Sequence, residues 1–277
     1  MSTATTRRGS GLGFAMPAIL LLAAFFIIPV AALLMRSVTE PELGLQNYAA
    51  LLGSATYAKV FLNTFFVAGL VTAVTILIAF PVAWALAILP RPWAAILFAV
   101  ILLSMWTNLL ARTYAWMVLL QQTGLINRAL MAIGLIDQPL QLTNNLIGVT
   151  IGMVYIMLPF MILPLVGVIR KIDPAILQAA ALCGATRGQA LRRVLLPLAA
   201  PGLVSGGLMV FVMSLGYFVT PSLLGGTANM MLPELIVQQV QSLVNWGMGG
   251  AAAFLLLVVT LGLYALQLRF FEPKEAR

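Results

Sequence analysis

The stretch LIGVTIGMVYIMLPFMILPLVGVI, residues 146–169, contains no charged side chain along its whole length. An α-helix needs about 20 apolar residues to cross the hydrocarbon core of a bilayer, and this stretch is long enough to do so. Its residues do not alternate between polar and apolar, as the residues of a membrane-spanning strand do. The stretch therefore predicts a transmembrane helix.

Five more stretches of the same kind lie before and after it. The run that begins at residue 14 follows Arg7 and Arg8, so a secretory signal peptide is the alternative reading there. The apolar part of a signal peptide has only about 7–15 residues, and this run is longer, so we favour a span. We predict an all-α membrane protein with a bundle of six transmembrane helices, at residues 14–35, 61–89, 93–120, 146–169, 198–224 and 248–268.

The composition supports lipid as the solvent of this chain. Of its 277 residues, 62% are hydrophobic and 8% are charged, whereas soluble domains carry about 25% charged residues. The net charge of +8 raises nucleic acid as a partner. We exclude it because the basic residues are scattered over short loops rather than gathered on one face. The sequence has no histidine and a single cysteine, Cys183, so intramolecular disulfides are excluded.

The distribution of lysine and arginine predicts the orientation. With the N-terminus in the cytoplasm, 11 basic residues fall on the inner side and 4 on or near the outer side. The positive-inside rule favours this arrangement, which also places the C-terminus inside. The outer residues are Arg36, Lys59, Arg112 and Arg128, and the inner ones are Arg7, Arg8, Arg91, Arg170, Lys171, Arg187, Arg192, Arg193, Arg269, Lys274 and Arg277.

The inner loop at residues 170–197 is longer than a connector between two spans needs to be. Asp173 followed by Pro174 is a good helix start, and the next residues favour a helix up to Gly184. A second short helix is predicted at residues 186–195. Two short helices that meet at a glycine form an elbow, and small side chains on its first arm allow another protein to approach closely. The alternative is an amphipathic surface helix without a partner.

This loop resembles a motif of the binding-protein-dependent ABC importers. The family pattern is Glu-Ala-Ala, three residues, Gly, nine residues and Ile-x-Leu-Pro, and the spacing here matches it without gaps. The two departures are Gln178 in place of Glu, which removes a charge, and Val194 in place of Ile. The matching residues are Gln178-Ala179-Ala180, Gly184 and Val194-Leu195-Leu196-Pro197.

The resemblance implies that this loop holds a coupling helix, which docks on a separate ATPase subunit. It implies that this chain binds no cofactor and no metal, and that the partner ATPase uses ATP and Mg. The implied partners are a homologous second permease, an ATPase dimer, a periplasmic solute-binding protein and the lipid of a bacterial inner membrane. The chain would comprise a tail at 1–13, a permease domain at 14–270 and a tail at 271–277. The implied coupling residues are Gln178, Ala179, Ala180, Gly184, Arg187, Leu196 and Pro197.

Other segments resemble the first permease of spermidine/putrescine importers. They are Arg112–Trp116, Leu158–Pro164, Gly216–Pro221 and Leu224–Gly226. The resemblance implies a polyamine substrate. An importer for another small organic solute, amino-acid-like or opine-like, is the alternative.

Candidates for the substrate pathway follow from side-chain chemistry. A proline inside a span frees backbone carbonyls, which line a cavity or only accompany a packing kink. Aromatic rings bind ammonium groups, although membrane aromatics more often serve packing. For Glu234 we favour a solvated carboxylate over a cation guide. The candidates are Trp106, Asn108, Tyr155, Pro159, Tyr217, Phe218 and Glu234.

Arg112 lies within the third apolar stretch, near its predicted outer end. An arginine in a cation pathway would repel the substrate, so we predict a structural or gating role beside Asn108. A secondary transporter or channel would need more ionisable groups within the spans. A membrane enzyme would need a cluster of histidine, acids or a nucleophile, and no such cluster occurs. We therefore expect a non-enzymatic permease.

Overall fold

The computed structural model describes the backbone of residues 11–271 and the side chains of residues 15–266. Within that part of the chain every regular element is a helix. The chain divides into two compact units. The first unit contains Met1–Ala55 and Ile236–Leu255, and the second contains Thr56–Leu235 and Leu256–Arg277. The all-helical class predicted from the sequence is confirmed.

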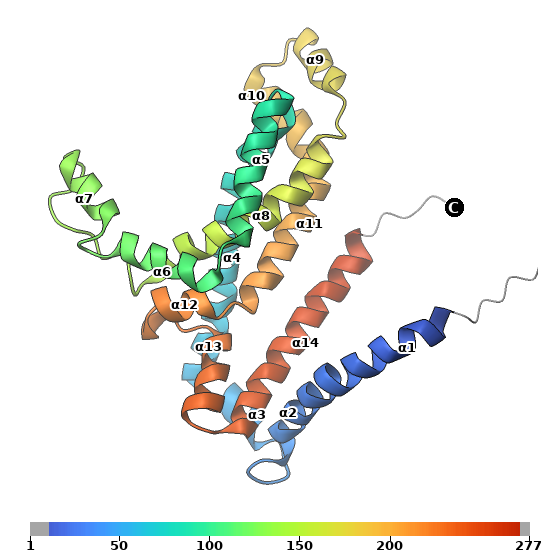
Figure 1. Cartoon of the computed structure of the whole chain (residues 1–277), viewed down its shortest axis with the longest axis vertical. Coiled ribbons are helices and arrows are strands. Elements are labelled where there is room, and N and C mark those ends of the chain that lie inside the picture. The colour runs from blue at the N-terminus through green and yellow to red at the C-terminus, as the bar shows by residue number, and fades with distance from the viewer. Residues whose placement is uncertain (1–10, 272–277) are drawn as a thin grey trace, which may run out of the picture. The chain divides into compact units, whose positions relative to one another are not determined.

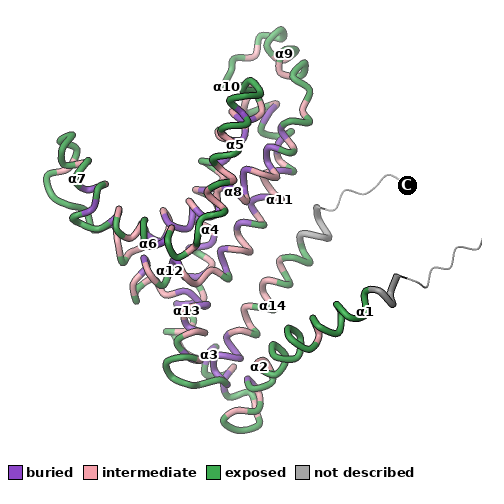
Figure 2. Tube along the Cα trace, in the orientation of Figure 1, coloured by how far each residue is buried: buried purple, intermediate pink, exposed green. Residues whose placement is uncertain are grey.

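The first unit begins with a long apolar helix. It comprises α1 (Gly11–Leu22), a π-helical turn at Ala23–Ile27 and α2 (Ile28–Thr39). Its side chains are mostly exposed, as Figure 2 shows for α1, and this suits a helix surrounded by lipid. The unit also contains α3 (Gln46–Gly53), a π-helical turn at Gln238–Ser242 and the first part of α14 (Trp246–Phe271).

Polar and ring contacts hold these helices of the first unit together. The buried amide of Asn47 donates hydrogen bonds to the carbonyls of Ser37, at 2.9 Å, and Glu40, at 2.7 Å. These bonds close the loop between α2 and α3. The guanidinium of Arg36 lies 5.0 Å from the centre of the Trp246 ring, so a cation–π contact joins α2 to α14.

The second unit is a bundle around α8 (Leu146–Ile169), the helix with the most buried residues. The long helix α4 (Ala55–Ile88), α5 (Arg91–Trp106) and α11 (Leu196–Leu215) accompany it. Helices α8 and α11 run side by side (Figures 1 and 2). Close approach is possible because a Cβ on Gly206 of α11 would lie only 2.7 Å from the sulfur of Met161.

The third predicted span is not one straight helix. Residues 93–120 divide into α5 and α6 (Leu109–Leu120), and the axis bends by 101° between them. The bend corrects the expectation of a straight span at 93–120. The helix stops because Thr107 adopts an extended backbone and the Asn108 side chain caps the start of α6. Among the residues that the structure describes, five continuous helices qualify as spans by length and composition, and the number reaches the expected six if this bent pair counts as one span.

The fifth span also differs from its predicted range of 198–224. It ends at Leu215, and α12 (Val219–Leu224) is a separate short helix. At its other end, α10 (Arg187–Ala190) continues through a π-helical turn at Leu191–Leu195 into α11. The wide turn ends two residues before Pro197, which has no N–H for a regular helical bond. The second arm of the predicted elbow is thus the beginning of the span itself.

Candidate functional site

The first arm of the elbow is α9 (Pro174–Leu182). Asp173 caps it, because its Oδ1 accepts a hydrogen bond of 2.9 Å from the Ala175 N–H. Pro174 occupies the first helical turn, where a missing N–H costs nothing. The helix start predicted at Asp173 and Pro174 is therefore confirmed.

Gly184 forms the corner of the elbow. Its φ of +81° is a left-handed conformation, which glycine adopts without steric cost. The Ala185 N–H bonds the Ala180 carbonyl at 3.1 Å, and the Gly184 N–H bonds the Ala181 carbonyl at 3.0 Å. This pair of bonds ends a helix in a defined geometry. Thr186 and Gln189 then cap α10 reciprocally, so both arms are fixed at the corner.

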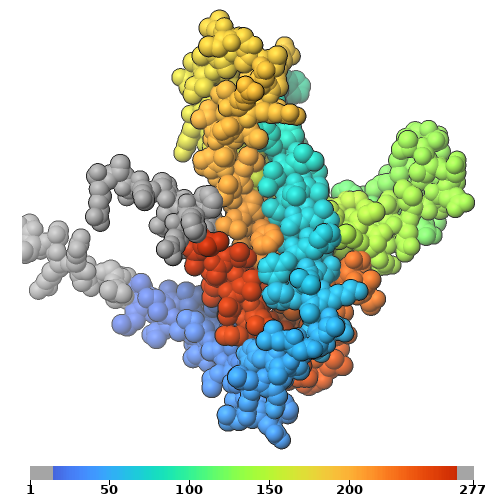
Figure 3. All heavy atoms as spheres, turned by 180° about the vertical axis from the view of Figure 1, so that it is seen from behind, coloured from blue at the N-terminus to red at the C-terminus, as the bar shows by residue number. Residues whose placement is uncertain are grey.

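The elbow presents small and apolar side chains to the outside. Leu182 is 89% exposed and Ile176 is 43% exposed. Gln178, Ala179 and Arg187 are also exposed, and Ala180 is half-buried. Figure 3 shows the elbow, in yellow, at one end of the second unit, projecting beyond the helices that carry it. Exposed apolar residues on a projecting segment are typical of an interaction surface.

The inner side of the elbow faces a cavity of about 370 Å³. Its wall includes Trp84 of α4, Leu177 of α9 and Leu195 of the π-helical turn. Leu196 and Pro197, two of the predicted coupling residues, lie in the first turn of α11 instead of in the elbow. The other five predicted coupling residues lie together in α9, the corner and α10.

Asn108 and Arg112 lie at the break between α5 and α6. The side-chain oxygen of Asn108 accepts hydrogen bonds from the N–H groups of Leu110, at 2.9 Å, and Ala111, at 3.3 Å. The Nη1 of Arg112 donates to the carbonyl of Ser104, at 2.9 Å, in the last turn of α5. A helix end leaves such carbonyls without helical partners, so Arg112 ties the two helices together across the break.

The aromatic candidates lie around the two helix breaks. Trp106 is 89% exposed at the end of α5. Tyr217 and Phe218 are half-buried in the link between α11 and α12.

Two further pathway candidates, Tyr155 and Pro159, lie on α8. Tyr155 contacts the edge of the Trp116 ring, with 5.6 Å between ring centres. Pro159 is buried in the interior of the helix. A contact of 3.4 Å between the hydroxyl oxygens of Thr113 and Thr220 joins α6 to α12. The structure thus brings most of the pathway candidates to the junction of α6, α8 and α12.

Glu234 lies elsewhere in the second unit, in α13 (Leu232–Val237). Its Oε1 is buried without a hydrogen-bond partner. Burial raises the pKa of Glu234 from 4.5 to about 7, although a hydrogen bond with the Met231 backbone opposes the shift. The expectation of a freely solvated carboxylate is therefore wrong.

Two residues of α4 hold this segment, and the sequence reasoning missed them. The Leu232 N–H donates to Thr64 Oγ1 at 2.8 Å, and the Asn63 side chain donates to the Met230 carbonyl at 3.0 Å. The signal that pointed to them was their polarity inside an otherwise apolar span. Polar groups at such positions are costly unless they find a partner.

The sequence of this chain also matches known proteins. Residues 49–275 match the family described as "Binding-protein-dependent transport system inner membrane component". The spermidine/putrescine transport system permease protein PotB of Salmonella typhimurium LT2 is 35% identical over 215 residues, which cover 78% of this chain and 75% of that protein. The inner membrane ABC transporter permease protein YdcU of Escherichia coli K12 is 34% identical over 239 residues, which cover 81% and 74%.

Solved structures support the same fold. A chain of a bacterial alginate ABC transporter, crystallised with an alginate-bound periplasmic protein, superimposes with a TM-score of 0.74 at 18% identity, over 94% of each chain. A chain of the MetNI methionine ABC transporter gives 0.53 at 18% identity, over 76% of this chain and 90% of that one. Because the family match extends over most of the sequence, this chain belongs to the inner membrane components of binding-protein-dependent transport systems and is a permease subunit of an ABC importer.

Proposed function

We propose that this permease carries a polyamine, such as spermidine or putrescine, across the bacterial inner membrane. The observation that carries the proposal is the 35% identity to PotB over 78% of the chain. The aromatic rings near the two helix breaks suit the passage of an alkyl ammonium chain, because ring faces attract cations. Both termini would lie in the cytoplasm, as the distribution of basic residues predicts.

The inner loop at residues 170–197, which contains the elbow, is the element that couples transport to ATP. A separate ATPase subunit would receive Leu182 and its exposed neighbours, and ATP and Mg would bind to that subunit. Gln178 carries no charge, so its contact with the ATPase would be a hydrogen bond rather than an ion pair. A second, homologous permease and a periplasmic solute-binding protein complete the importer.

Glu234 is the best candidate for direct contact with an ammonium group. A buried oxygen without a partner has unused hydrogen-bonding capacity, and leaving it unpaired costs free energy. An ammonium group that approaches it would satisfy that oxygen and stabilise the charged carboxylate. Arg112 serves instead to hold the break between α5 and α6.

The test is transport by the assembled importer in proteoliposomes. This chain is co-expressed with the second permease, the ATPase and the binding protein of its importer, and ATP-dependent uptake of labelled spermidine and putrescine is measured. Arginine and an opine serve as competitors. We expect saturable uptake that requires the binding protein and is inhibited by unlabelled polyamine.

Two outcomes distinguish the parts of the proposal. Uptake of the amino acid or the opine without uptake of polyamine would refute the substrate and leave the importer assignment intact. Polyamine uptake that continues with a hydrolysis-deficient ATPase would refute the coupling mechanism.

A further inference from the structure

A second cavity, of about 550 Å³, opens beside the ends of α4, α5 and α8. It lies on the membrane side that the positive-inside rule assigns to the cytoplasm. None of the coupling or pathway candidates lines it. Its wall consists of Leu86, Ala87, Leu89, Arg91, Ala94, Ala95, Phe98 and Arg170.

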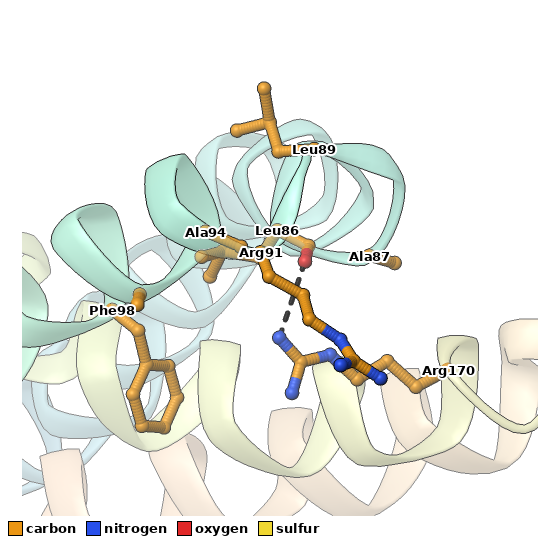
Figure 4. A pocket seen from close by; sticks show the side chains of 8 residues that line it. Leu86, Ala87, Leu89, Arg91, Ala94, Phe98 and Arg170 are labelled. Atoms are coloured by element: carbon orange, nitrogen blue, oxygen red, sulfur yellow. Dashed lines mark hydrogen bonds between the residues drawn. The ribbon is translucent and has the colours of Figure 1, made fainter.

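Two arginines from different helices share this cavity. Arg91 is the first residue of α5, and Arg170 directly follows α8. Figure 4 shows both side chains extending into the pocket, with their guanidinium groups on the same side of Leu86. The two residues are 79 positions apart in the sequence, so the fold itself brings their charges together.

The backbone positions one of these arginines. The Nη2 of Arg170 donates a hydrogen bond of 3.3 Å to the Leu86 carbonyl. In a regular helix that carbonyl would accept from residue 90, but residue 90 is a proline and has no N–H. Arg170 therefore supplies the hydrogen-bond donor that the Leu86 carbonyl lacks at the end of α4. A guanidinium has five N–H donors, so several stay available to a ligand.

The positive charge of the cavity is not neutralised from its own wall, because none of its eight lining residues is acidic. In the part of the chain that the structure describes, neither arginine of the cavity forms an ion pair. The ion pair found there joins Arg36 and Glu40, which belong to the other unit. Two guanidinium groups in one cavity repel each other, and an anion between them relieves that repulsion. Arginine pairs are well suited to phosphate, because each fork donates two parallel hydrogen bonds.

The rest of the wall is apolar and suits a lipid rather than a free anion. Leu86 and Ala94 are buried, and Phe98 is half-buried beside them. These residues belong to helices that enter the hydrocarbon region, so an acyl chain can lie against them while its headgroup reaches the arginines. We propose that this cavity binds the phosphate headgroup of an anionic phospholipid of the cytoplasmic leaflet, such as phosphatidylglycerol.

The experiment uses the complete importer in nanodiscs of phosphatidylcholine that contain a minority of phosphatidylglycerol. Native mass spectrometry after release from the nanodiscs measures how much phosphatidylglycerol remains bound, as its proportion in the nanodisc is varied. The variants are Arg91→Gln, Arg170→Gln and the double variant. Lys171→Gln is the matched control, because Lys171 is exposed, adjacent to Arg170 and not part of the wall.

We expect the affinity for phosphatidylglycerol to fall about fivefold for each arginine removed and about 30-fold for both. Lys171→Gln should retain an affinity close to that of the unmodified importer, because Lys171 is not part of the wall. Arg91→Gln keeps the hydrogen bond between Arg170 and Leu86, so its effect cannot arise from loss of that bond. The thermal stability of each complex in pure phosphatidylcholine checks that the variants are folded.

Three results would overturn the proposal. One is unchanged lipid retention in the double variant. Another is an equal loss in Lys171→Gln, which would indicate general surface charge instead of a built site. The third is displacement of the lipid by inorganic phosphate with the same dependence on both arginines, which would make the cavity a site for free phosphate.

Discussion

Replacement of Gly184 by alanine tests the coupling elbow directly. Gly184 has a φ of +81°, and an added Cβ would meet nothing within 4 Å. The substitution thus introduces conformational strain without a clash. A non-glycine residue in the left-handed region loses about 1–2 kcal/mol. Such a cost lowers the population of the bent elbow relative to an unbent one by a factor of about 5–30.

The assay is the ratio of polyamine transported to ATP hydrolysed in proteoliposomes. We expect Gly184→Ala to lower this ratio while the amount of folded importer in the membrane stays close to normal. Gly184→Asn should lower it less, because asparagine tolerates the left-handed region better than alanine does.

Gly188→Ala is the matched control for this prediction. Gly188 lies in α10 of the same elbow, has no positive φ, and a Cβ there also meets nothing within 4 Å. Alanine at a helical position is favoured over glycine by up to about 1 kcal/mol, so coupling should be retained. Equal loss of coupling in Gly184→Ala and Gly188→Ala, or normal coupling in both, would refute the reasoning.

Three further predictions concern the interior of the second unit. If Glu234 contacts the substrate, the KM for spermidine should fall as the pH rises through about 7, because the carboxyl group of Glu234 then becomes charged. Glu234→Gln should flatten this pH dependence of KM. Arg112→Gln should destabilise the importer by about 1.5–3 kcal/mol in thermal unfolding, because the Ser104 carbonyl loses a charged donor. Arg112→Lys should restore part of the lost stability. Gly206→Leu should cost about 1–3 kcal/mol in the same assay, because α8 leaves no room for the side chain.

Each of these predictions has its own check. The raised pKa of Glu234 also makes stability fall as the pH rises from about 4.5 to about 7, because the folded carboxyl group holds its proton more tightly. A purely structural Glu234 would show that loss of stability without any change in KM. Equal unfolding temperatures for Arg112→Gln and Arg112→Lys would exclude the charged hydrogen bond. Gly167→Leu, at an exposed and open position of α8, is the control for Gly206→Leu.

Hydropathy predicted where the chain meets lipid, but not where its helices break. Residues 93–120 are apolar on average despite the polar Thr107 and Asn108, so hydropathy averaged over a window shows one span. The break depends on a single capping side chain, which such an average does not register. Likewise, Gly216 interrupts an apolar run that continues to Leu224.

Local motifs predicted the elbow well, because its geometry is encoded locally. Asp173, Pro174 and Gly184 each act on backbone groups within a few residues. The burial of Glu234 could not be predicted this way, because the segment that carries it is held by residues about 170 positions earlier in the sequence. The same applies to Arg170, whose partner Leu86 lies 84 positions away.

In the proposed coupling mechanism, the helix from Arg187 to Leu215 would work as a lever. It has 29 residues, and at about 1.5 Å per residue it is about 43 Å long. A tilt of about 5° about one end of such a rod displaces the other end by about 4 Å. Because the second arm of the elbow is the end of this rod, a tilt imposed at the elbow would be transmitted to Gly216, where Tyr217 and the junction with α12 begin. The stiffness of the π-helical turn at Leu191–Leu195 would then determine how much of this tilt reaches Gly216.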